Sequence, residues 1–542
     1  MVNEKEFKET YSNLNHDQLL DLAYRLQNEV NLLLENNASY KRSLYGRKRE
    51  LVDINQLSLF NEAEVSNDTV TKEELNEEEI KPVKRKHSRN SKLKELKVKR
   101  IDIKMDNPVC DICGGKLSEI KPKTIRRLVY KPSELYIEET IIHQYTCHNC
   151  SDKEDTFYIF QNNDYKEPRQ LIKGSMVTSS FIANVAYKKY VQGVPFYRQE
   201  KDLNDNGIPI SRQVICNWFI RCGDKYLKPI FNQMEKDIRK ADIINMDETT
   251  LLCLEERENG RESKSYEWLC MSNEYETKQM ALFYYKSDRS HNNVSEILGD
   301  KYKGIIQSDG YKAYKTYTSA KGHAGCLSHA RRKFEDYLKD NVILYKKLSN
   351  KGISKEEKQK LLDNNPSFSN ALWFVNQFDK VFKIERKAKA DKLDIKAKEK
   401  IRNELERPLL DELYNKALSL IDSYSQSGKL YKALNYLINQ WPSLIYYLDD
   451  GRIPASNNLA EREGIKPFVM ARKNFLFADT INGAQISSIW FSLIISARLN
   501  KLNIEKYLTY ILEVMSSKDE ITDDLIESCL PYSSKLPDNI KL

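Results

Sequence analysis

The sequence predicts a multidomain α/β protein, and three observations support this prediction. The chain has 542 residues, more than one hydrophobic core ordinarily organises. Hydrophobic residues make up 40% of the chain, which is enough for well-packed cores. From Ala241 onward, runs with strand-like patterning surround a short helical segment, whereas residues 170–240 and 501–542 have helical patterns. We therefore expect a central α/β domain flanked by helical and smaller domains.

Residues 1–61 are predicted to form a heptad helix. Leu19, Leu26 and Leu33 recur every seven residues, and a polar Asn37 falls within the same repeat. A buried polar residue of this kind often fixes the register of a coiled-coil dimer. The pattern favours a homo-oligomer, although an amphipathic helix packed on its own domain explains so short a repeat as well.

Residues 62–105 are predicted to be a flexible linker because their apolar content is too low for a core. A glutamate cluster is followed, between Lys81 and Arg100, by ten Lys and Arg residues against one acid. That local surplus exceeds the net charge of +8 of the whole chain. Such a run suits DNA phosphates or is simply a solvated tail, and we weigh the two readings evenly. The predicted phosphate contacts are Lys84, Arg85, Lys86 and Arg89.

Two Cys-x-x-Cys pairs predict a zinc-binding ribbon over residues 106–160. The pairs are separated by a segment rich in β-formers, and their cysteines are Cys110, Cys113, Cys147 and Cys150. Four thiolates on two knuckles suit tetrahedral Zn²⁺, although His143 or His148 is an alternative ligand. With four protein ligands the zinc is structural and has no open position for catalysis.

Residues 170–240 contain a pattern typical of a helix-turn-helix. A helix that begins near Pro195 is followed by a turn at residues 206–209, and Ser211 is placed to cap the second helix. Arg212, Gln213 and Asn217 lie on the leading turns of that second helix, where side chains reach base edges in DNA-binding proteins. A purely structural helix pair is the alternative.

The segment from Ala241 predicts three strands, a helix and a further strand. Two of these strands are expected to end in an exposed aspartate, Asp247 after IINM and Asp309 after GIIQS. If the two strands are neighbours, their ends lie about 5 Å apart, and the carboxylates project over one sheet edge. An aspartate at a strand end is often only a turn former. The pair nevertheless predicts a metal site.

A third carboxylate, Glu461, strengthens the prediction of a metal site. It follows the pair Asn457 and Asn458 at the start of a predicted helix, and a basic patch with Lys466, Arg472 and Lys473 follows it. Carboxylates beside cations and amides do not favour a hydrophobic core. They suit a site that binds Mg²⁺ together with the phosphates of a substrate.

In the order of its motifs, the chain resembles the transposases of the IS66 family of insertion sequences over nearly its whole length. The resemblance rests on CDICGG and CHNC, PFYRQEKDLNDNGIPISRQVICNWF, MDET, IIQSDGYKAY, GCLSHARRKFED and SNNLAEREGIKPFVMARKNFLFAD. It implies a ribonuclease-H-like catalytic core over residues 241–500, with a helical insertion at about 330–450. It also implies that Asp247, Asp309 and Glu461 form the acidic (DDE) triad.

The chain departs from the family pattern at Ser456, where similar proteins commonly carry Asp before the asparagine pair. The departure puts in doubt a metal role for position 456 only. Glu463 is the runner-up for the third carboxylate. Cys326 and His329 resemble a Cys-x-x-His signature of related transposases, and we interpret His329 as an active-site organiser or a DNA contact.

The resemblance implies a DNA transposase that cuts and joins DNA strands with Mg²⁺ or Mn²⁺ at the triad. The expected partners are double-stranded DNA, further copies of the chain and small accessory proteins of the same element. No apolar run suits a membrane span and no signal peptide precedes the chain, so we expect a cytoplasmic, nucleoid-associated protein. The remaining predicted DNA contacts are His329, Arg331, Arg332, Asn457, Asn458, Arg462, Arg472 and Lys473.

Two alternatives belong to other functional classes. The first is a transposase-derived DNA-binding protein that no longer cuts, and the presence of all three acids argues against it. The second is a glycosidase that uses two carboxylates. The basic linker, the cysteine pairs and the cations after Glu461 favour a polyanionic substrate over a sugar.

Overall fold

The computed structural model describes residues 15–20, 22, 26, 30, 144–146, 159–161, 169–258, 264–348, 353–518 and 520–542. Leu19 and Leu26 lie in helical backbone and are 43% and 46% exposed. Leu33, Asn37, the basic linker and the four cysteines of the predicted zinc site lie outside the described residues. The heptad seam, the linker and the zinc ribbon therefore stay predictions.

Residues 69–168 form a compact unit of their own, distinct from the unit that contains residues 169–542. Within it, β1 (Gln144–Thr146) pairs antiparallel with β2 (Ile159–Gln161). Strand β1 ends directly before the second cysteine pair and β2 follows that pair, so the two strands fall at the end of the range predicted for the ribbon.

After a first helix, α5, the helical region contains two helices, α6 and α7, joined by a turn where the sequence predicts one. The turn between its two helices contains Gly207 with a φ of 78°, a value that glycine adopts without strain. Ser211 caps the second helix by accepting a hydrogen bond from the Val214 amide at 3.4 Å. The elements are α5 (Ser179–Tyr190), α6 (Phe196–Asp205), α7 (Arg212–Cys222), η2 (Gly223–Leu227) and α8 (Lys228–Ile238).

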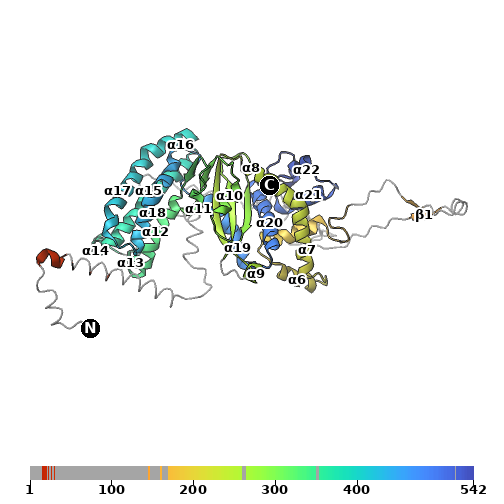
Figure 1. The fold of residues 1–542 in the computed structure, drawn as a ribbon, viewed down its shortest axis with the longest axis horizontal. Helices are drawn as coiled ribbons and strands as arrows, with labels where there is room; N and C mark the ends of the chain where they lie inside the picture. Colours follow the sequence, from red (N-terminus) through yellow and green to blue (C-terminus); the bar gives the residue numbers. More distant parts are fainter. Residues whose placement is uncertain are drawn as a thin grey trace, which may run out of the picture. The chain divides into compact units, whose positions relative to one another are not determined.

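The α/β domain is built on a mixed sheet, whose strands are the green arrows near the middle of Figure 1. The sheet has six strands in the order β5-β4-β3-β6-β7, with β8 paired to the far end of β3. Strands β3, β4 and β5 are antiparallel neighbours, whereas β6 and β7 run parallel to β3. The predicted three strands, helix and strand are confirmed. They are β3 (Ile243–Cys253), β4 (Ser265–Ser272), β5 (Ala281–Lys286), α10 (Asn292–Leu298) and β6 (Ile305–Gln307), followed by α11 (Lys312–Lys315) and β7 (Gly322–Ala324).

The predicted strand end at Asp247 is wrong. Strand β3 continues to Cys253, because residues 248–251 keep pairing with β4 after the parallel pairing to β6 stops at Asn245. Asp247 therefore lies within a strand and is half-buried instead of exposed. Asp309 does follow the end of β6, and β3 and β6 are neighbours as expected.

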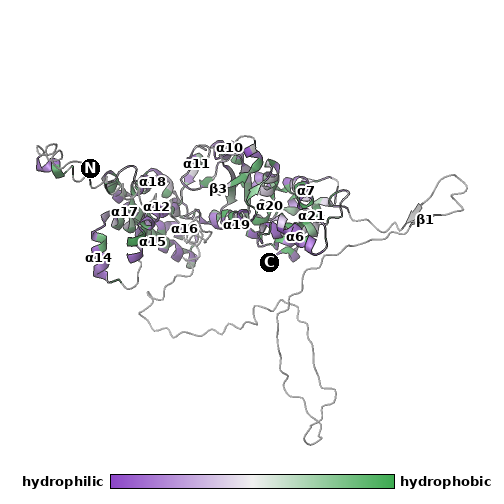
Figure 2. Ribbon diagram, turned by 90° about the horizontal axis from the view of Figure 1, so that it is seen from below, coloured by the Kyte–Doolittle hydropathy of each residue, from purple (hydrophilic) through white to green (hydrophobic). Residues whose placement is uncertain are grey.

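In the sequence, a helical insertion follows β7 before the chain returns to the sheet. The insertion has a hydrophobic core of its own. Ile243, Ile305 and Ala324 of the sheet contribute to that core, which anchors the insertion on the starts of β3 and β6 and on the end of β7. Helix α14 has no buried residue and is mainly hydrophilic (Figure 2). The helices are α12 (Leu327–Asp340), α13 (Val342–Leu348), α14 (Lys355–Asp363), α15 (Pro366–Ala390), α16 (Ile395–Ile401), η3 (Arg402–Glu406), α17 (Arg407–Leu420), η4 (Ile421–Ser423), α18 (Lys429–Leu444) and η5 (Tyr446–Asp449).

After the insertion the chain returns to the sheet. Helix α20 packs on β5, where the hydroxyls of Ser492 and Ser496 accept hydrogen bonds from the amides of Phe283 and Ala281 at 2.8 and 2.9 Å. Within the described part of the chain, no helix is both long and apolar enough to cross a membrane. These elements are η6 (Ala460–Ile465), α19 (Lys466–Phe475), β8 (Phe477–Ala478), α20 (Ile481–Leu499), α21 (Ile504–Ser516), α22 (Asp523–Cys529) and η7 (Asp538–Ile540), while a short helix, α9 (Leu254–Glu258), follows β3.

Candidate active site

Four carboxylates meet where β3, β6 and η6 come together. Asp247 and Glu248 lie on β3, Asp309 follows β6, and Glu461 lies in the π-helix η6. Burial, and then the charges of Glu248, Glu461 and Asp309, raise the pKa of Asp247 well above its ordinary value. Among the described residues, Asp247 forms no ion pair that would offset this repulsion, and its one hydrogen bond comes from the Glu248 amide at 2.8 Å. The predicted triad is thus electrostatically coupled.

Glu248, which the sequence did not single out, is held by two partners of its own. Arg289 donates from Nε to Glu248 at 2.6 Å, and the Tyr314 hydroxyl donates to the other carboxylate oxygen. The guanidinium of Arg289 also lies 3.8 Å from the centre of the Tyr311 ring. Burial and then Asp309 raise the pKa of Glu248. Because Glu248 has these fixed partners, it is less suited than Asp247 to bind a new cation.

A buried network of amides holds the elements of the site together. The Asn245 side chain donates to Gln307 at 2.9 Å and to Asn457 at 2.8 Å, which joins β3, β6 and the segment before η6. Asn457 in turn donates to the Met246 carbonyl at 3.0 Å. Asn457 is completely buried, so the prediction that it contacts DNA is wrong. Its side chain instead ties the segment before η6 to the backbone of β3 directly before Asp247.

Helix α12 borders the other side of Glu461. His329 Nδ1 lies 3.6 Å from one carboxylate oxygen, and an Arg332 nitrogen lies 3.5 Å from the other. Burial, and then Arg332 and Lys333, lower the pKa of His329 to about 3, so this histidine is neutral near pH 7 and its contact with Glu461 is not a salt bridge. The placement favours the reading of His329 as an organiser of the site over that of a DNA contact.

Cys326 completes this side of the site. Its sulfur accepts a hydrogen bond from the backbone N–H of Asn457 at 3.2 Å, and burial raises the pKa of the thiol to about 12. Ligand-type atoms of Cys326, His329 and Glu461 lie within 4.8 Å of one another. The nearby Arg332 guanidinium supplies positive charge, so the arrangement orients Glu461 without requiring a metal of its own.

The sequence profile described as Transposase IS66 family matches residues 174–486. The chain belongs to the IS66 transposase family. Two further profiles match outside that range: the zinc-finger binding domain of transposase IS66 over residues 107–151, and Transposase C of IS166 homeodomain over residues 32–101. Membership supports a transposase role with DNA binding, a divalent metal and zinc binding.

Similar sequences occur in Sinorhizobium fredii, where they are described as uncharacterized proteins. One of them, y4jD, is 27% identical over 445 residues, which is 80% of this chain and 79% of that protein. Another, y4hP, is 25% identical over 412 residues, which is 74% of this chain and 70% of that protein.

The insertion of this IS66 transposase also reaches the acidic site. A Cβ at Gly310, next to Asp309, would lie 2.6 Å from the Tyr436 ring of α18, so only glycine fits beneath this aromatic side chain. Gln440 donates to the Gly310 carbonyl at 3.4 Å, and the Lys333 ammonium lies 4.4 Å from the centre of the Tyr436 ring. The insertion therefore supports the backbone that carries Asp309.

The predicted DNA contacts of the transposase fall into three groups. Arg212, Gln213, Asn217, Arg462 and Lys473 are exposed, and Asn458 is half-buried. Arg331 pairs with Glu335 and Asp379 at 2.8 Å within the insertion, and Arg332 faces Glu461. Arg472 extends across β3 and donates to the hydroxyls of Thr249 and Thr250, each at 3.1 Å. The contacts predicted in the basic linker lie outside the described residues.

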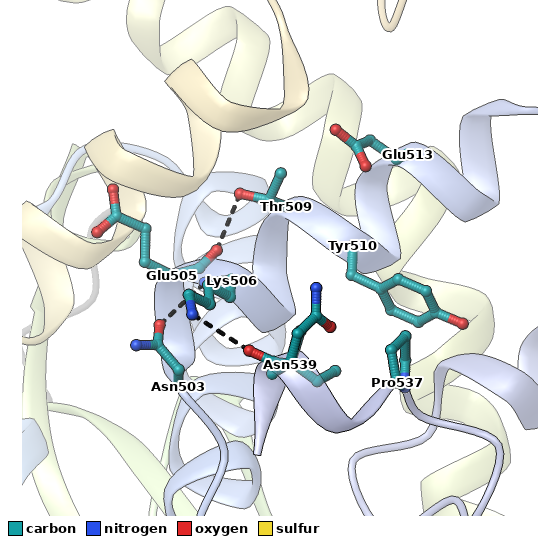
Figure 3. A pocket seen from close by; sticks show the side chains of 9 residues that line it. Asn503, Glu505, Lys506, Thr509, Tyr510, Glu513, Pro537 and Asn539 are labelled. Carbon is teal, nitrogen blue, oxygen red and sulfur yellow. Dashed lines mark hydrogen bonds between the residues drawn. The ribbon is translucent and has the colours of Figure 1, made fainter. Parts of the chain in front are cut away.

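A pocket of about 470 Å³ lies near the C-terminus, between α21 and the segment around η7 (Figure 3). Lys506 crosses it and donates to the Asn539 carbonyl at 3.2 Å, and Figure 3 shows Tyr510 and Glu513 along its edge. None of the residues that line it belongs to β3, β6 or η6. The pocket is therefore separate from the acidic site.

Proposed function

We propose that this protein cleaves and joins DNA strands at the ends of its insertion sequence, with Asp247, Asp309 and Glu461 as the acidic triad of a ribonuclease-H-like core. The observation that carries the proposal is the position of Asp247, which is surrounded by three other carboxylates and has no cationic partner among the described residues. The strand order, with three antiparallel strands followed by two parallel ones, is the order expected of a ribonuclease-H-like core.

The residues of the site fit divalent cations of the Mg²⁺ type. Their donors are carboxylate oxygens, which hard cations prefer, and their mutual repulsion is relieved when a cation binds. When bound, such ions activate a water or a 3′-hydroxyl for in-line attack on phosphorus and stabilise the leaving oxygen. Asp247, Asp309 and Glu461 would hold them.

The surrounding residues would fix the triad in place. The Asn245–Gln307–Asn457 network holds β3, β6 and η6 in register, while His329 and Arg332 orient Glu461. Arg289 and Tyr314 keep Glu248 engaged, so that this acid does not compete for the ions. Such pre-organisation lowers the reorganisation that the reaction requires.

The remaining parts would recognise DNA. We assign structural Zn²⁺ to Cys110, Cys113, Cys147 and Cys150, phosphate contacts to the basic linker, and base contacts to Arg212, Gln213 and Asn217. A homo-oligomer that holds two DNA ends, assisted by small accessory proteins, completes the proposed assembly.

The decisive experiment compares Glu461→Gln with Glu463→Gln. Glu463 is two residues away and pairs with Arg462 at 2.8 Å, so it is a matched acid outside the triad. Labelled DNA with the ends of the element is incubated with Mg²⁺ or Mn²⁺, and nicking and joining are measured together with binding. We expect Glu461→Gln to bind without cutting and Glu463→Gln to cut.

Two outcomes would contradict the proposal. Equal cutting by wild type and Glu461→Gln would remove Glu461 from the triad. Binding without cutting by wild type, even with the accessory proteins added, would favour a DNA-binding protein that has lost catalysis.

A further inference from the structure

The polar face of α18, in the helical insertion, contains no acidic residue. The buried side chains of this helix, among them Leu434 and Leu437, lie on one side. Its exposed and half-buried polar side chains lie on the opposite side, at the spacing of 3.6 residues per turn. None of the 16 residues of α18 is Asp or Glu, whereas α12, α14, α15 and α17 each contain acids. We call this surface the α18 face, and it consists of Lys429, Lys432, Asn435, Tyr436, Asn439 and Gln440.

One end of the α18 face lies against the backbone beside Asp309. The Tyr436 ring covers Gly310, where a Cβ would approach the ring to 2.6 Å. Gln440, one turn further along α18, donates to the Gly310 carbonyl at 3.4 Å. Burial, and then the charges of Cys326 and Asp309, raise the pKa of Tyr436. The α18 face is therefore continuous with the acidic site.

Two cations of this region have no acidic partner among the described residues. Lys333 belongs to α12, the helix beside α18 (Figure 1); it is exposed and lies 4.4 Å from the centre of the Tyr436 ring. Lys432 is exposed on α18, one turn before Tyr436. By contrast, Lys429 at the start of α18 pairs with Asp340. Positive charge without a counter-charge is thus concentrated around Tyr436.

The composition and the position of the α18 face indicate which ligand it suits. A helix face that is merely solvated usually carries both signs of charge in ion pairs. Here lysines without acids lie beside amide and phenol groups, and these are the side chains that contact the phosphates and sugars of DNA. Asp247 is an acid without a cationic partner, which suits a metal ion, whereas Lys333 and Lys432 are cations without an acidic partner, which suit phosphates.

We propose that the α18 face binds the backbone of the DNA strand next to the reacting phosphate, with Lys333 and Lys432 at its phosphates. This inference rests on the proposed function. Eight residues of α18 separate Lys432 from Gln440, or about 12 Å at the rise of a helix. That length corresponds to roughly three or four nucleotides of B-form DNA. The Tyr436 ring lies between these two ends and holds the Lys333 ammonium in place.

The test measures which phosphates the α18 face contacts. The probe is a duplex with the end sequence of the element, in which a neutral methylphosphonate replaces one phosphate at a time. All proteins carry Glu461→Gln so that the DNA stays intact, and binding is measured at several salt concentrations. We expect methylphosphonates within about four nucleotides of the cleavage site to weaken binding.

Three variants in that background identify the lysines. Lys333→Ala and Lys432→Ala should each weaken binding by about tenfold and lower the slope of log K against log salt concentration by about one, since one charged contact is lost. A methylphosphonate at the phosphate that the lysine contacts should then have no further effect. Lys416→Ala is the matched control, because Lys416 lies 4.2 Å from the centre of the Trp373 ring in the same insertion and is not part of the α18 face. We expect the control to bind like the parent protein and all three variants to melt like it.

The outcomes distinguish the inference from the function on which it rests. If wild type cuts the duplex while Lys333→Ala and Lys432→Ala bind like the parent protein or like Lys416→Ala, the α18 face is overturned and the transposase proposal stands. If the methylphosphonates coupled to these lysines lie far from the cleavage site, the proposed position of the strand is overturned. If the lysine variants instead abolish a dimer measured by sedimentation, the surface is a protein interface and the inference is overturned as well. If the parent protein does not bind the duplex and wild type does not cut it, both proposals fail.

Discussion

In the described part of the chain, the acids of the helical insertion and the acids at the sheet are stabilised in opposite ways. In the insertion, Arg402 is 2% exposed, donates twice to Glu385 at 2.7 and 3.0 Å, and also binds the carbonyls of Tyr447 and Asp450. The neighbouring Glu406 accepts a hydrogen bond from Tyr447 at 2.6 Å. At the sheet, Asp247 has three acidic neighbours and no cationic partner among the described residues.

The difference teaches how a structural charge cluster is distinguished from a functional one. Burying a charge costs several kcal/mol unless a partner offsets it, so a cluster that only supports the fold contains its own counter-charge. The insertion cluster meets this condition with Arg402. At the acidic site, Asp247 has no such counter-charge among the described residues. This is expected if a bound cation supplies the counter-charge.

The largest expected effect is on activity, from Asp247→Asn. This change should lower strand cleavage by on the order of 10³-fold or more because one ligand of the catalytic cations is lost. Because the pKa of Asp247 is raised, the stability that its neutral form provides is lost as pH rises, and asparagine keeps that form. The variant should therefore melt at a higher temperature than wild type at pH 7 without metal.

The control for that prediction is Asp242→Asn, at an acid that directly precedes β3, is 72% exposed and pairs with Arg452. It should change neither cleavage nor melting by much. A variant Asp247→Asn that is inactive but less stable than wild type would indicate that Asp247 has a structural role.

The next effect is on stability, from Arg402→Met. It leaves Glu385 and Glu406 without their buried counter-charge and should lower the free energy of unfolding by about 3–5 kcal/mol. Chemical denaturation measures it. Arg407→Met is the comparison, since the Arg407–Asp449 pair is largely exposed and should contribute less than about 1 kcal/mol. Equal losses from both changes would contradict the account of the insertion cluster.

A third prediction concerns metal addition and removal. At a Mg²⁺ concentration about 100 times its Kd, the stability of wild type should rise by about 2.7 kcal/mol, and chelation should reverse the rise. Asp247→Asn should lose most of this response. Glu406→Gln should keep it, because Glu406 lies in the other cluster. A Mg²⁺ response that survives Asp247→Asn would place the cation elsewhere.

The smallest expected effect is a pH dependence in the insertion. Burial and then Glu385 raise the pKa of Glu406 to about 8 from an ordinary 4.5. The stability linked to its protonated form is fully present below pH 4.5 and is lost as pH rises through about 8. Glu406→Gln should therefore reduce the fall in stability between pH 5 and pH 8, by on the order of 1–2 kcal/mol. Thermal melts across that range test it, and an unchanged slope would exclude Glu406 as its source.

The sequence predicts the sheet better than it predicts the site. Strand patterning predicts the strands β3, β4, β5 and β6, and the cap at Ser211 predicts the start of α7. The extent of β3 was missed because the polar residues Asp247 to Thr250 interrupt its apolar pattern, while pairing with β4 carries the strand through them. That pairing is a tertiary effect that local patterning does not contain.

Within the site, the residues that the sequence did not predict are those whose partners lie far away in the sequence. Asn245 and Gln307 look like ordinary polar residues in strands, and only the fold shows that both meet near Asn457. In the sequence, nothing distinguishes Arg289 and Tyr314 from the other arginines and tyrosines of the chain. The MDET motif did contain one signal, since Glu248 adjoins Asp247, and a second acid in a buried strand requires a partner.

The position of the insertion has a consequence for the timing of synthesis. Asp247 and Asp309 precede it, whereas Glu461 follows it, 152 residues after Asp309. At bacterial elongation rates, about 8–30 s pass on the ribosome between the appearance of Asp309 and that of Glu461. During that interval the nascent chain contains α6 and α7, to which we assign base contacts in the proposed function, but it has an incomplete set of acids. A ribosome-bound or prematurely terminated chain would therefore lack the third acid of the proposed triad, so strand cleavage would require the completed chain.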